Sequence, residues 1–390
     1  MMSGSTKETM WPVLTLAFGA FVAQTTEYLP IGLLPQIGGA FAVPEGFVGA
    51  LVTGYAWIAA ATAIPLTLAT GAMGRRRLFL LLLAILTLAN ALAACAQGYV
   101  ALAVCRIAVA LTHGVFWSIL ASFAVRVAPH IPPGRAAAWV FSGISAAIVG
   151  GVPLAAAIGQ WGSWRLAFGA FALLGAVALT LGRAVLPPLR SDSCGRTLRL
   201  PRGNKRLYGA AAITALSLTA HFSGYTYVVP LLTGAGHIAA VALPALFVTF
   251  GVAGAAGNAL AGLLAGRAVE TVALALSCIV GAQLLIHLSA SVHILVWIAL
   301  VLWGGAISML IVGLQSWVLE LALADEADAA SALYVAAFNV GIGAGALAGG
   351  LALAGAGVHG VLATSAAIGV LALGGLAIVA GLPRTNRADV

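Results

Sequence analysis

A succession of long apolar stretches constrains the fold of this chain more than any other feature of its sequence. Crossing the roughly 30 Å hydrocarbon core of a bilayer takes about 20 apolar residues, since a helix rises 1.5 Å per residue. About twelve segments meet this criterion, and their approximate bounds are 11–36, 47–71, 77–97, 99–127, 135–158, 165–186, 207–233, 240–265, 269–289, 292–322, 329–353 and 358–381. The sequence therefore predicts an all-α polytopic membrane protein with twelve transmembrane helices.

The composition agrees with a membrane protein and excludes the common soluble classes. Charged residues make up 7% of the chain and the mean hydropathy is +1.09, whereas soluble domains contain about 25% charged residues. The first apolar run lacks the cleavage pattern of a signal peptide, so we expect it to remain as the first span. The cysteines are scattered and suggest neither a disulfide framework nor a metal site; they are Cys95, Cys105, Cys194 and Cys278.

The basic residues are distributed unevenly about the predicted spans. All 18 Lys and Arg residues except Arg106 and Arg165 lie on one side of the membrane when the spans alternate in direction. The positive-inside rule places this side, with both termini, in the cytoplasm. The net charge of +8 therefore reflects the Lys and Arg residues that gather on the cytoplasmic side of the membrane. We expect no nucleic acid partner.

The longest polar stretch divides the chain into two groups of six predicted spans. We expect an N-terminal half over 1–186, a cytoplasmic linker over 187–206 and a C-terminal half over 207–390. The halves resemble each other weakly, since Val52–Ala56 recurs loosely as Val248–Val252. A repeat in corresponding helices of two six-helix halves is typical of secondary transporters.

Glycine-rich runs are common in the predicted helices, but they do not resemble nucleotide-binding loops. The runs at 251–257 and 341–349 follow no predicted strand, and small residues at such spacing let helices approach closely in lipid. No G-x-x-x-x-G-K-[ST] motif occurs, because the only lysines are Lys7 and Lys205. The sequence also lacks a metal-ligand cluster and a nucleophile motif, so we expect neither an enzyme nor a cofactor.

Glu27 is the only acidic residue that we place within the hydrocarbon. Inserting a carboxylate into the hydrocarbon costs at least about 2.5 kcal/mol of free energy on insertion scales, so its presence suggests a functional role. Glu27 lies about 13 Å and Arg106 about 10 Å from the outer ends of their spans, at similar levels. Two interpretations stay open: Arg106 is a structural strut at the bend near Pro30, or the pair, or Glu27 alone, responds to protonation and to substrate.

Other polar and aromatic residues occur at mid-depth in several spans. Arg106, His113 and Trp117 share one face of the fourth span because they fall at i, i+7 and i+11. Core packing remains an alternative for His113, and an interfacial anchor is the interpretation for Tyr227 near the end of its span. Such groups on several helices favour a lined cavity; the candidate substrate-binding residues are Glu27, His113, Trp117, His221, Tyr225, Trp303, Gln315 and Asn339.

The fourth and fifth spans each carry a motif: the segment 106–129 begins with Arg106 and contains His113, and the segment 143–165 contains Gly150 and Pro153. These two segments resemble motif B and the antiporter motif C of bacterial sugar-efflux transporters, which are arabinose-efflux-permease-like members of the drug:proton antiporter branch of the major facilitator superfamily. The segments 26–30, 219–225 and 338–345 are also similar to the same group. The similarity runs from the first to the eleventh span.

The resemblance implies a monomeric transporter in the bacterial cytoplasmic (inner) membrane that exports a small polar solute, such as a sugar, in exchange for protons. Glu27, Arg106 and His113 would couple transport to protons, and the proton gradient would supply the energy. The gating residues would be Arg75, Arg76, Arg77, Gly150, Gly151 and Pro153. Gly71 departs from the superfamily pattern because it occupies the place of an acid before the basic cluster, so the usual charge lock is in doubt.

The nature of the cargo stays open at the level of the sequence. Polyhydroxy solutes would use the hydrogen-bonding side chains, whereas lipophilic drugs would use Trp117, Trp303 and Phe338. A multidrug or nucleoside exporter of the same fold is therefore the alternative within the transporter class. A passive channel or a non-transporting receptor is an alternative of another class. A channel would show rings of like charge or a repeated filter, and a receptor would need a larger soluble module than the loops provide.

Overall fold

The computed structural model describes residues 3–131, 133–189, 204–289, 292–322 and 326–382. The chain divides into two compact units, the first formed by 1–42 with 61–195 and the second by 43–60 with 196–390. Most of the predicted linker at 187–206 lies outside the described residues, so the predicted half boundaries stay a prediction.

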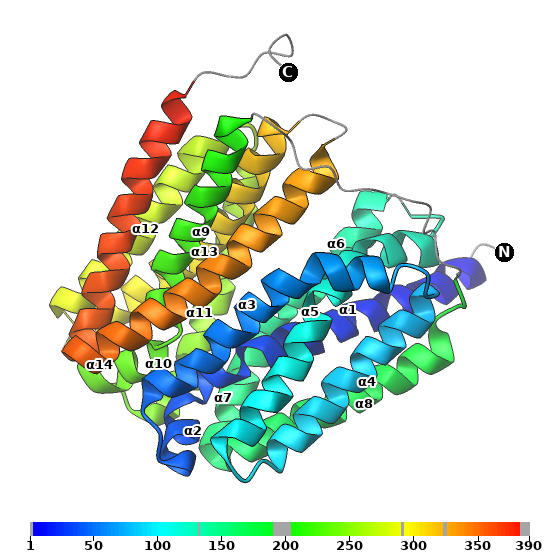
Figure 1. Cartoon of the computed structure of the whole chain (residues 1–390), viewed down its shortest axis with the longest axis horizontal. Coiled ribbons are helices and arrows are strands. Elements are labelled where there is room, and N and C mark those ends of the chain that lie inside the picture. The colour runs from blue at the N-terminus through cyan, green and yellow to red at the C-terminus, as the bar shows by residue number, and fades with distance from the viewer. Residues whose placement is uncertain (1–2, 132, 190–203, 290–291, 323–325, 383–390) are drawn as a thin grey trace. The chain divides into compact units, whose positions relative to one another are not determined.

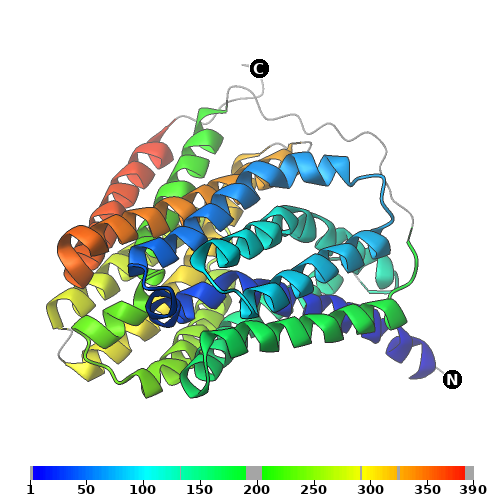
Figure 2. The same ribbon diagram turned by 60° about the horizontal axis from the view of Figure 1, so that its bottom comes forward.

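The first unit is a bundle of long helices (Figure 1). Helix α4 lies side by side with α8, and α1 packs against α6, α7 and α8 (Figures 1 and 2). Its elements are α1 (Ser3–Gly32), α2 (Leu34–Phe41), the later part of α3 (Glu45–Ala69), α4 (Arg75–Ala94), α5 (Tyr99–Val127), α6 (Pro133–Ala146), the π-helical turn η1 (Ala147–Gly151), α7 (Val152–Trp161) and α8 (Trp164–Val185).

The second unit is a bundle in which α9 packs along α14, and α13 packs against both α11 and α12. The first part of α3 belongs to this unit, because Thr53 Oγ1 donates a hydrogen bond to the carbonyl of Gly343 at 3.1 Å. Its other elements are α9 (Lys205–Tyr225), α10 (Val228–Pro230), η2 (Leu231–Ala235), η3 (Ala240–Ala242), α11 (Leu243–Leu263), α12 (Ala268–Ser289), α13 (His293–Leu321) and α14 (Ala327–Gly381).

The all-α prediction is confirmed, and every predicted span coincides with helical structure. Within the described ranges, 9 helices are long and apolar enough to cross a membrane. The last of them, Ala329–Gly381, covers two predicted spans and bends at Gly357, whose φ of 64° a residue with a side chain rarely adopts. Helices α1 and α9 are not among the nine, and both carry several buried polar side chains.

Small residues allow the helices of the second unit to approach closely. A Cβ atom at Gly257 of α11 would meet the carbonyl of Gly305 in α13 and lie 2.8 Å from the Cα atom of Gly305. Nothing lies within 4 Å of a Cβ atom built at Gly262 on the same helix. The packing interpretation of the 251–257 glycine run is therefore supported, since backbone on both sides leaves no room for a methyl group.

We expect Gly257→Ala to destabilise the protein by about 1–3 kcal/mol, because the added methyl group forces the backbones of α11 and α13 apart. Gly262→Ala is the matched control, since it adds the same methyl group to the same helix in open space. Thermal unfolding in detergent checks the difference. Equal melting temperatures for the two variants would show that the α11–α13 contact does not limit stability.

Candidate functional site

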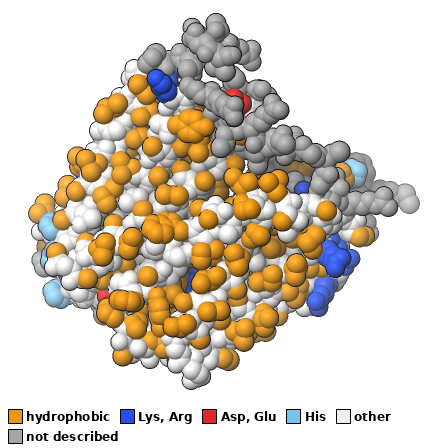
Figure 3. Space-filling view, in the orientation of Figure 1, with side chains coloured by type: hydrophobic (Ala, Val, Ile, Leu, Met, Phe, Trp, Pro, Cys, Tyr) orange, Lys and Arg blue, Asp and Glu red, His pale blue; other side chains and the backbone are white. Residues whose placement is uncertain are grey.

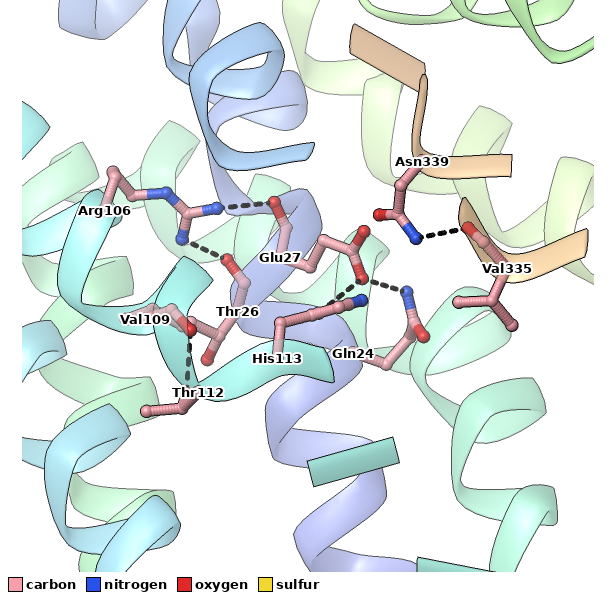
Figure 4. A network of polar contacts seen from close by, with 9 residues as sticks. All are labelled: Gln24, Thr26, Glu27, Arg106, Val109, Thr112, His113, Val335 and Asn339. Carbon is pink, nitrogen blue, oxygen red and sulfur yellow. Dashed lines mark hydrogen bonds and ion pairs between the residues drawn. The ribbon is translucent and has the colours of Figure 1, made fainter. Parts of the chain in front are cut away.

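Glu27 lies in the polar part of α1 and is 7% exposed. Its Oε2 atom accepts a hydrogen bond of 3.0 Å from Nε2 of Gln24, one helical turn earlier (Figure 4). His113 of α5 lies beside the same oxygen, with Nδ1 at 3.8 Å. The structure thus brings together Glu27 and His113, which were both predicted to couple transport to protons.

Arg106 of α5 reaches the backbone of α1 at the same level. Its Nη1 atom donates to the carbonyl of Thr26 at 2.7 Å, and Nη2 donates to the carbonyl of Glu27 at 2.9 Å (Figure 4). Pro30 explains why Thr26 needs a donor: proline has no N–H, so the carbonyl four residues earlier loses its helical partner. The prediction that Glu27 and Arg106 lie at similar depth is confirmed, and these contacts are those expected of a strut near Pro30.

Thr26 connects three helices of the first unit. Its carbonyl accepts from Arg106 of α5, and its hydroxyl oxygen accepts a 3.0 Å hydrogen bond from Nδ2 of Asn90 in α4. Asn90 is 1% exposed and was missed by the sequence analysis. An amide inside an otherwise apolar span was the available signal, because a buried polar side chain in a membrane helix requires a partner.

The remaining predicted residues of the first unit occupy different surroundings. Trp117 packs against Phe141 of α6, with ring centroids 6.4 Å apart, and against His113 at 6.0 Å. Gly151 ends the π-helical turn η1 and faces α1, because a Cβ atom there would meet the side chain of Thr25. Gly150 is exposed, and a Cβ atom built there would have no neighbour within 4 Å.

Pro153 is buried near the start of α7. It directly follows the wide turn of η1, and such a turn is an irregularity that often marks functional positions in helices. The structure therefore places Gly150, Gly151 and Pro153 at a break in the regular helix of the fifth predicted span. Their role in gating stays a prediction.

Three predicted substrate-binding residues lie together in the second unit. His221 stacks on Tyr225 with ring centroids 5.0 Å apart, and Tyr225 stacks on Phe250 at 5.1 Å. Trp303 Nε1 donates a 3.0 Å hydrogen bond to Nδ1 of His221. Since Nδ1 accepts this bond, the neutral imidazole carries its proton on Nε2, which is then a donor. The cluster offers aromatic faces together with a fixed hydrogen-bond donor.

We expect Trp303→Phe to lower stability by about 1–3 kcal/mol beyond the effect of lost volume, because Nδ1 of buried His221 loses its donor. Trp317→Phe is the matched control, since Trp317 is also buried in α13. Melting temperatures in detergent check the prediction. If both variants melt at the same temperature, the indole hydrogen bond does not hold the cluster.

Asn339 and Gln315 differ in their surroundings. Asn339 is 4% exposed, and its Nδ2 atom donates to the carbonyl of Val335 on the same helix at 2.9 Å (Figure 4). Its Oδ1 atom has no hydrogen-bond partner among the described residues, which leaves an acceptor for a ligand. Gln315 of α13 is exposed, so the structure does not place it in the aromatic cluster.

The interpretation of Tyr227 as an interfacial anchor is wrong. Tyr227 is 0% exposed, and its hydroxyl group donates to the carbonyl of Ala346 at 2.8 Å. Its ring occupies space left by glycines, since a Cβ atom at Gly349 would lie 2.8 Å from it and one at Gly350 would meet its hydroxyl group at 2.5 Å. The position near the end of a span misled the prediction because the glycines of α14 create room for a buried ring.

The basic cluster begins α4, and Gly74 precedes it. Arg76 Nη2 donates to the carbonyl of Arg183 at 2.6 Å. In the sequence, Glu320 and Asp325 are the acids that could pair with this cluster in place of the missing one at Gly71. Glu320 is exposed, and Asp325 lies outside the described residues. The described part of the chain contains no group of three or more His, Cys, Asp or Glu residues placed to hold a metal ion.

Comparison with known proteins gives a consistent family. The model of the Major Facilitator Superfamily matches residues 16–346. A protein of Helicobacter pylori (strain G27) named "Probable sugar efflux transporter" is 33% identical over 364 residues, which is 93% of each chain. A protein of the same name from Mannheimia succiniciproducens is 36% identical over 349 residues, covering 86% of this chain and 85% of the relative.

Solved structures show the same fold. The human organic anion transporter MFSD10 superposes with a TM-score of 0.68 at 18% identity, over 94% of this chain and 99% of the other. A mutant form of the nucleoside transporter NupG superposes with a TM-score of 0.78 at 10% identity, over 95% and 99% of the two chains. Together with the family match over most of the sequence, these similarities confirm the resemblance seen in the motifs: the chain belongs to the Major Facilitator Superfamily and is a transporter, not an enzyme.

Proposed function

We propose that this transporter is a proton-coupled antiporter that exports a small polar solute, a sugar, by alternating access. The observation that carries the proposal is the buried carboxylate of Glu27, held by Gln24 and placed beside His113. A carboxylate in the middle of a membrane span is costly unless it serves a function such as proton transfer. The names of the relatives support sugar as the cargo.

The coupling follows from two opposing effects on Glu27. Burial disfavours the charged carboxylate, whereas a nearby positive charge favours it. Arg106 is fixed to the backbone of α1 by two hydrogen bonds, so its charge stays near the level of Glu27. A rearrangement that changes the solvation of the carboxylate then changes its affinity for a proton, which links proton exchange to alternating access.

The aromatic cluster of the second unit supports a polyhydroxy cargo. Sugars require several hydrogen-bonding partners, and they also stack on aromatic faces. His221 Nε2 and the hydroxyl group of Tyr225 supply polar groups beside the rings of Phe250 and Trp303. The same rings would stack against a nucleobase or a drug-like cation, so a multidrug or nucleoside exporter is the second candidate.

The proposal includes the setting of the protein. The bacterial relatives favour a location in the bacterial cytoplasmic membrane, and the distribution of Lys and Arg favours an orientation with both termini in the cytoplasm. The proton gradient serves as the energy source without a cofactor, and the working unit is a monomer. A small-molecule substrate and the lipid bilayer are then the partners of the chain.

A binding panel tests the class of cargo. Purified protein is heated with a pentose, a disaccharide, a nucleoside or an amphipathic cation, because a ligand that binds only the folded state raises the melting temperature. We expect a sugar to give the largest shift and His221→Ala to abolish it. A shift with the nucleoside or the cation alone would replace sugar as the proposed cargo.

A flux experiment separates the antiporter from a passive channel. In proteoliposomes with an acidic interior, protons flow outward through an antiporter. This flow drives the solute identified by the binding panel inward against its own concentration gradient. We expect this accumulation, and we expect a protonophore to remove it. Solute that only equilibrates across the membrane would identify a channel or a uniporter.

A further inference from the structure

A groove with a basic rim lies between the beginning of α4 and the end of α8. Arginine side chains gather over these helix ends, where the space-filling view shows blue side chains (Figure 3). The groove has a volume of about 520 Å³, and it is lined by Gly74, Arg76, Arg77, Leu80, Leu81, Ala84, Arg183, Pro188 and Leu189. None of these residues belongs to the candidate site around Glu27.

Hydrogen bonds hold the two sides of the groove together. Arg76 Nη2 donates to the carbonyl of Arg183 at 2.6 Å, and the backbone N–H of Arg75 donates to the carbonyl of Leu189 at 3.2 Å. These contacts fix the beginning of α4 against the end of α8 and the segment after it. The groove is therefore part of the folded structure rather than a gap between separate elements.

The rim of the groove carries uncompensated positive charge within the described part of the chain. Arg76, Arg77 and Arg183 all line it, and none of them forms a salt bridge with a described acidic residue. Arg77 and Arg183 are exposed, so their guanidinium groups can meet a ligand. Arginine presents a planar fork of donors that matches the oxygens of a phosphate group.

The floor of the groove is apolar and continues along α4. Leu80 and Leu81 lie one helical turn beyond Arg76 and Arg77, and Ala84 lies a further turn away. The distance from Arg77 to Ala84 along the helix axis is about 10 Å. Ala84 leaves space in the floor, so a group held at the rim would have room for an apolar tail along the helix.

From this arrangement we propose that the groove binds an anionic phospholipid such as phosphatidylglycerol. The phosphate group contacts the three guanidinium groups, and one acyl chain lies along Leu81 and Ala84. Basic pockets between transmembrane helices on the cytoplasmic side bind acidic headgroups in this way. Only the assignment to the cytoplasmic leaflet depends on the proposed orientation; the binding itself is independent of cargo and of proton coupling.

Native mass spectrometry of the purified protein tests the proposal with phosphatidylglycerol and phosphatidylcholine as probes. We expect phosphatidylglycerol to bind more tightly, and the double variant Arg77→Gln/Arg183→Gln to weaken its binding about 25-fold, since each basic residue near an anionic lipid contributes roughly fivefold. The control is Arg135→Gln/Arg267→Gln, which removes two exposed arginines outside the groove. An equal loss in the control, or no loss in the groove variant, would overturn the proposal.

A second variant distinguishes a lipid from a free anion. Ala84→Trp fills the apolar floor and leaves the arginines in place, so we expect it to weaken phosphatidylglycerol binding while the variant keeps the melting temperature of the unmodified protein. Glycerol phosphate, which has the headgroup chemistry without acyl chains, is the comparison probe. Binding of glycerol phosphate as tightly as phosphatidylglycerol would overturn the lipid assignment. If Ala84→Trp fails to fold, the two arginine variants still decide the proposal.

Discussion

Glu27→Gln is expected to reduce pH-driven solute accumulation in proteoliposomes to the level of protein-free vesicles. Glutamine has nearly the same shape and can still hydrogen-bond to Gln24, but it cannot take up or release a proton. The solute site and the fold should survive, so exchange of labelled for unlabelled solute at equal pH should continue. This combination separates a loss of coupling from a loss of binding.

The control for this substitution is Glu270→Gln, because Glu270 is an exposed acid in the first turn of α12. It removes the same charge from the chain without touching the buried network. We expect proteoliposomes with Glu270→Gln to accumulate as much solute as those with the unmodified protein. If Glu27→Gln accumulates solute at the rate of the unmodified protein, Glu27 is not the proton carrier.

Arg106→Gln is expected to destabilise the protein by about 2–6 kcal/mol, since two buried carbonyl groups, those of Thr26 and Glu27, lose their charged donor. The reason the Thr26 carbonyl needs a donor is the missing N–H of Pro30. The effect should therefore be smaller in a Pro30→Ala background, where the substituted residue regains a backbone N–H that can bond to the carbonyl of Thr26.

The double-mutant cycle of Arg106→Gln and Pro30→Ala measures this coupling through melting temperatures and the fraction of monodisperse protein in detergent. Gln283→Leu provides a comparison, because Gln283 is buried in α12 and its side-chain amide has no hydrogen-bond partner among the described residues. Arg106→Gln should destabilise the protein less with alanine than with proline at position 30. Equal destabilisation would contradict the interpretation that Arg106 replaces the hydrogen bond missing at Pro30.

The helices of this protein could be predicted because each one needs a long apolar run to cross lipid. The predicted span 99–127 has the same bounds as α5. The breaks within the helices were harder to predict, because they depend on local backbone geometry. The π-helical turn at Ala147–Gly151 and the break of α9 after Tyr225 leave the hydropathy of the segments unchanged.

Part of the site could be predicted, because charged residues are rare within the apolar spans of the sequence. Glu27 and Arg106 could be identified as single residues, and helical spacing added His113. The carbonyl partners of Arg106 were not predicted, because main-chain acceptors carry no sequence signal apart from Pro30. Asn90 was also missed, since its partner Thr26 lies 64 positions away in the sequence and only the fold brings the two together.

The proton flux that accompanies solute movement tests the central claim most directly. Proteoliposomes enclosing a pH-sensitive dye are given the sugar identified by the binding panel on the outside, with no imposed pH difference. The account predicts that inward movement of the sugar makes the interior more alkaline in the unmodified protein, because protons leave in exchange, and that Glu27→Gln shows no change of pH. Sugar entry through the unmodified protein without any change of internal pH would contradict proton-coupled antiport.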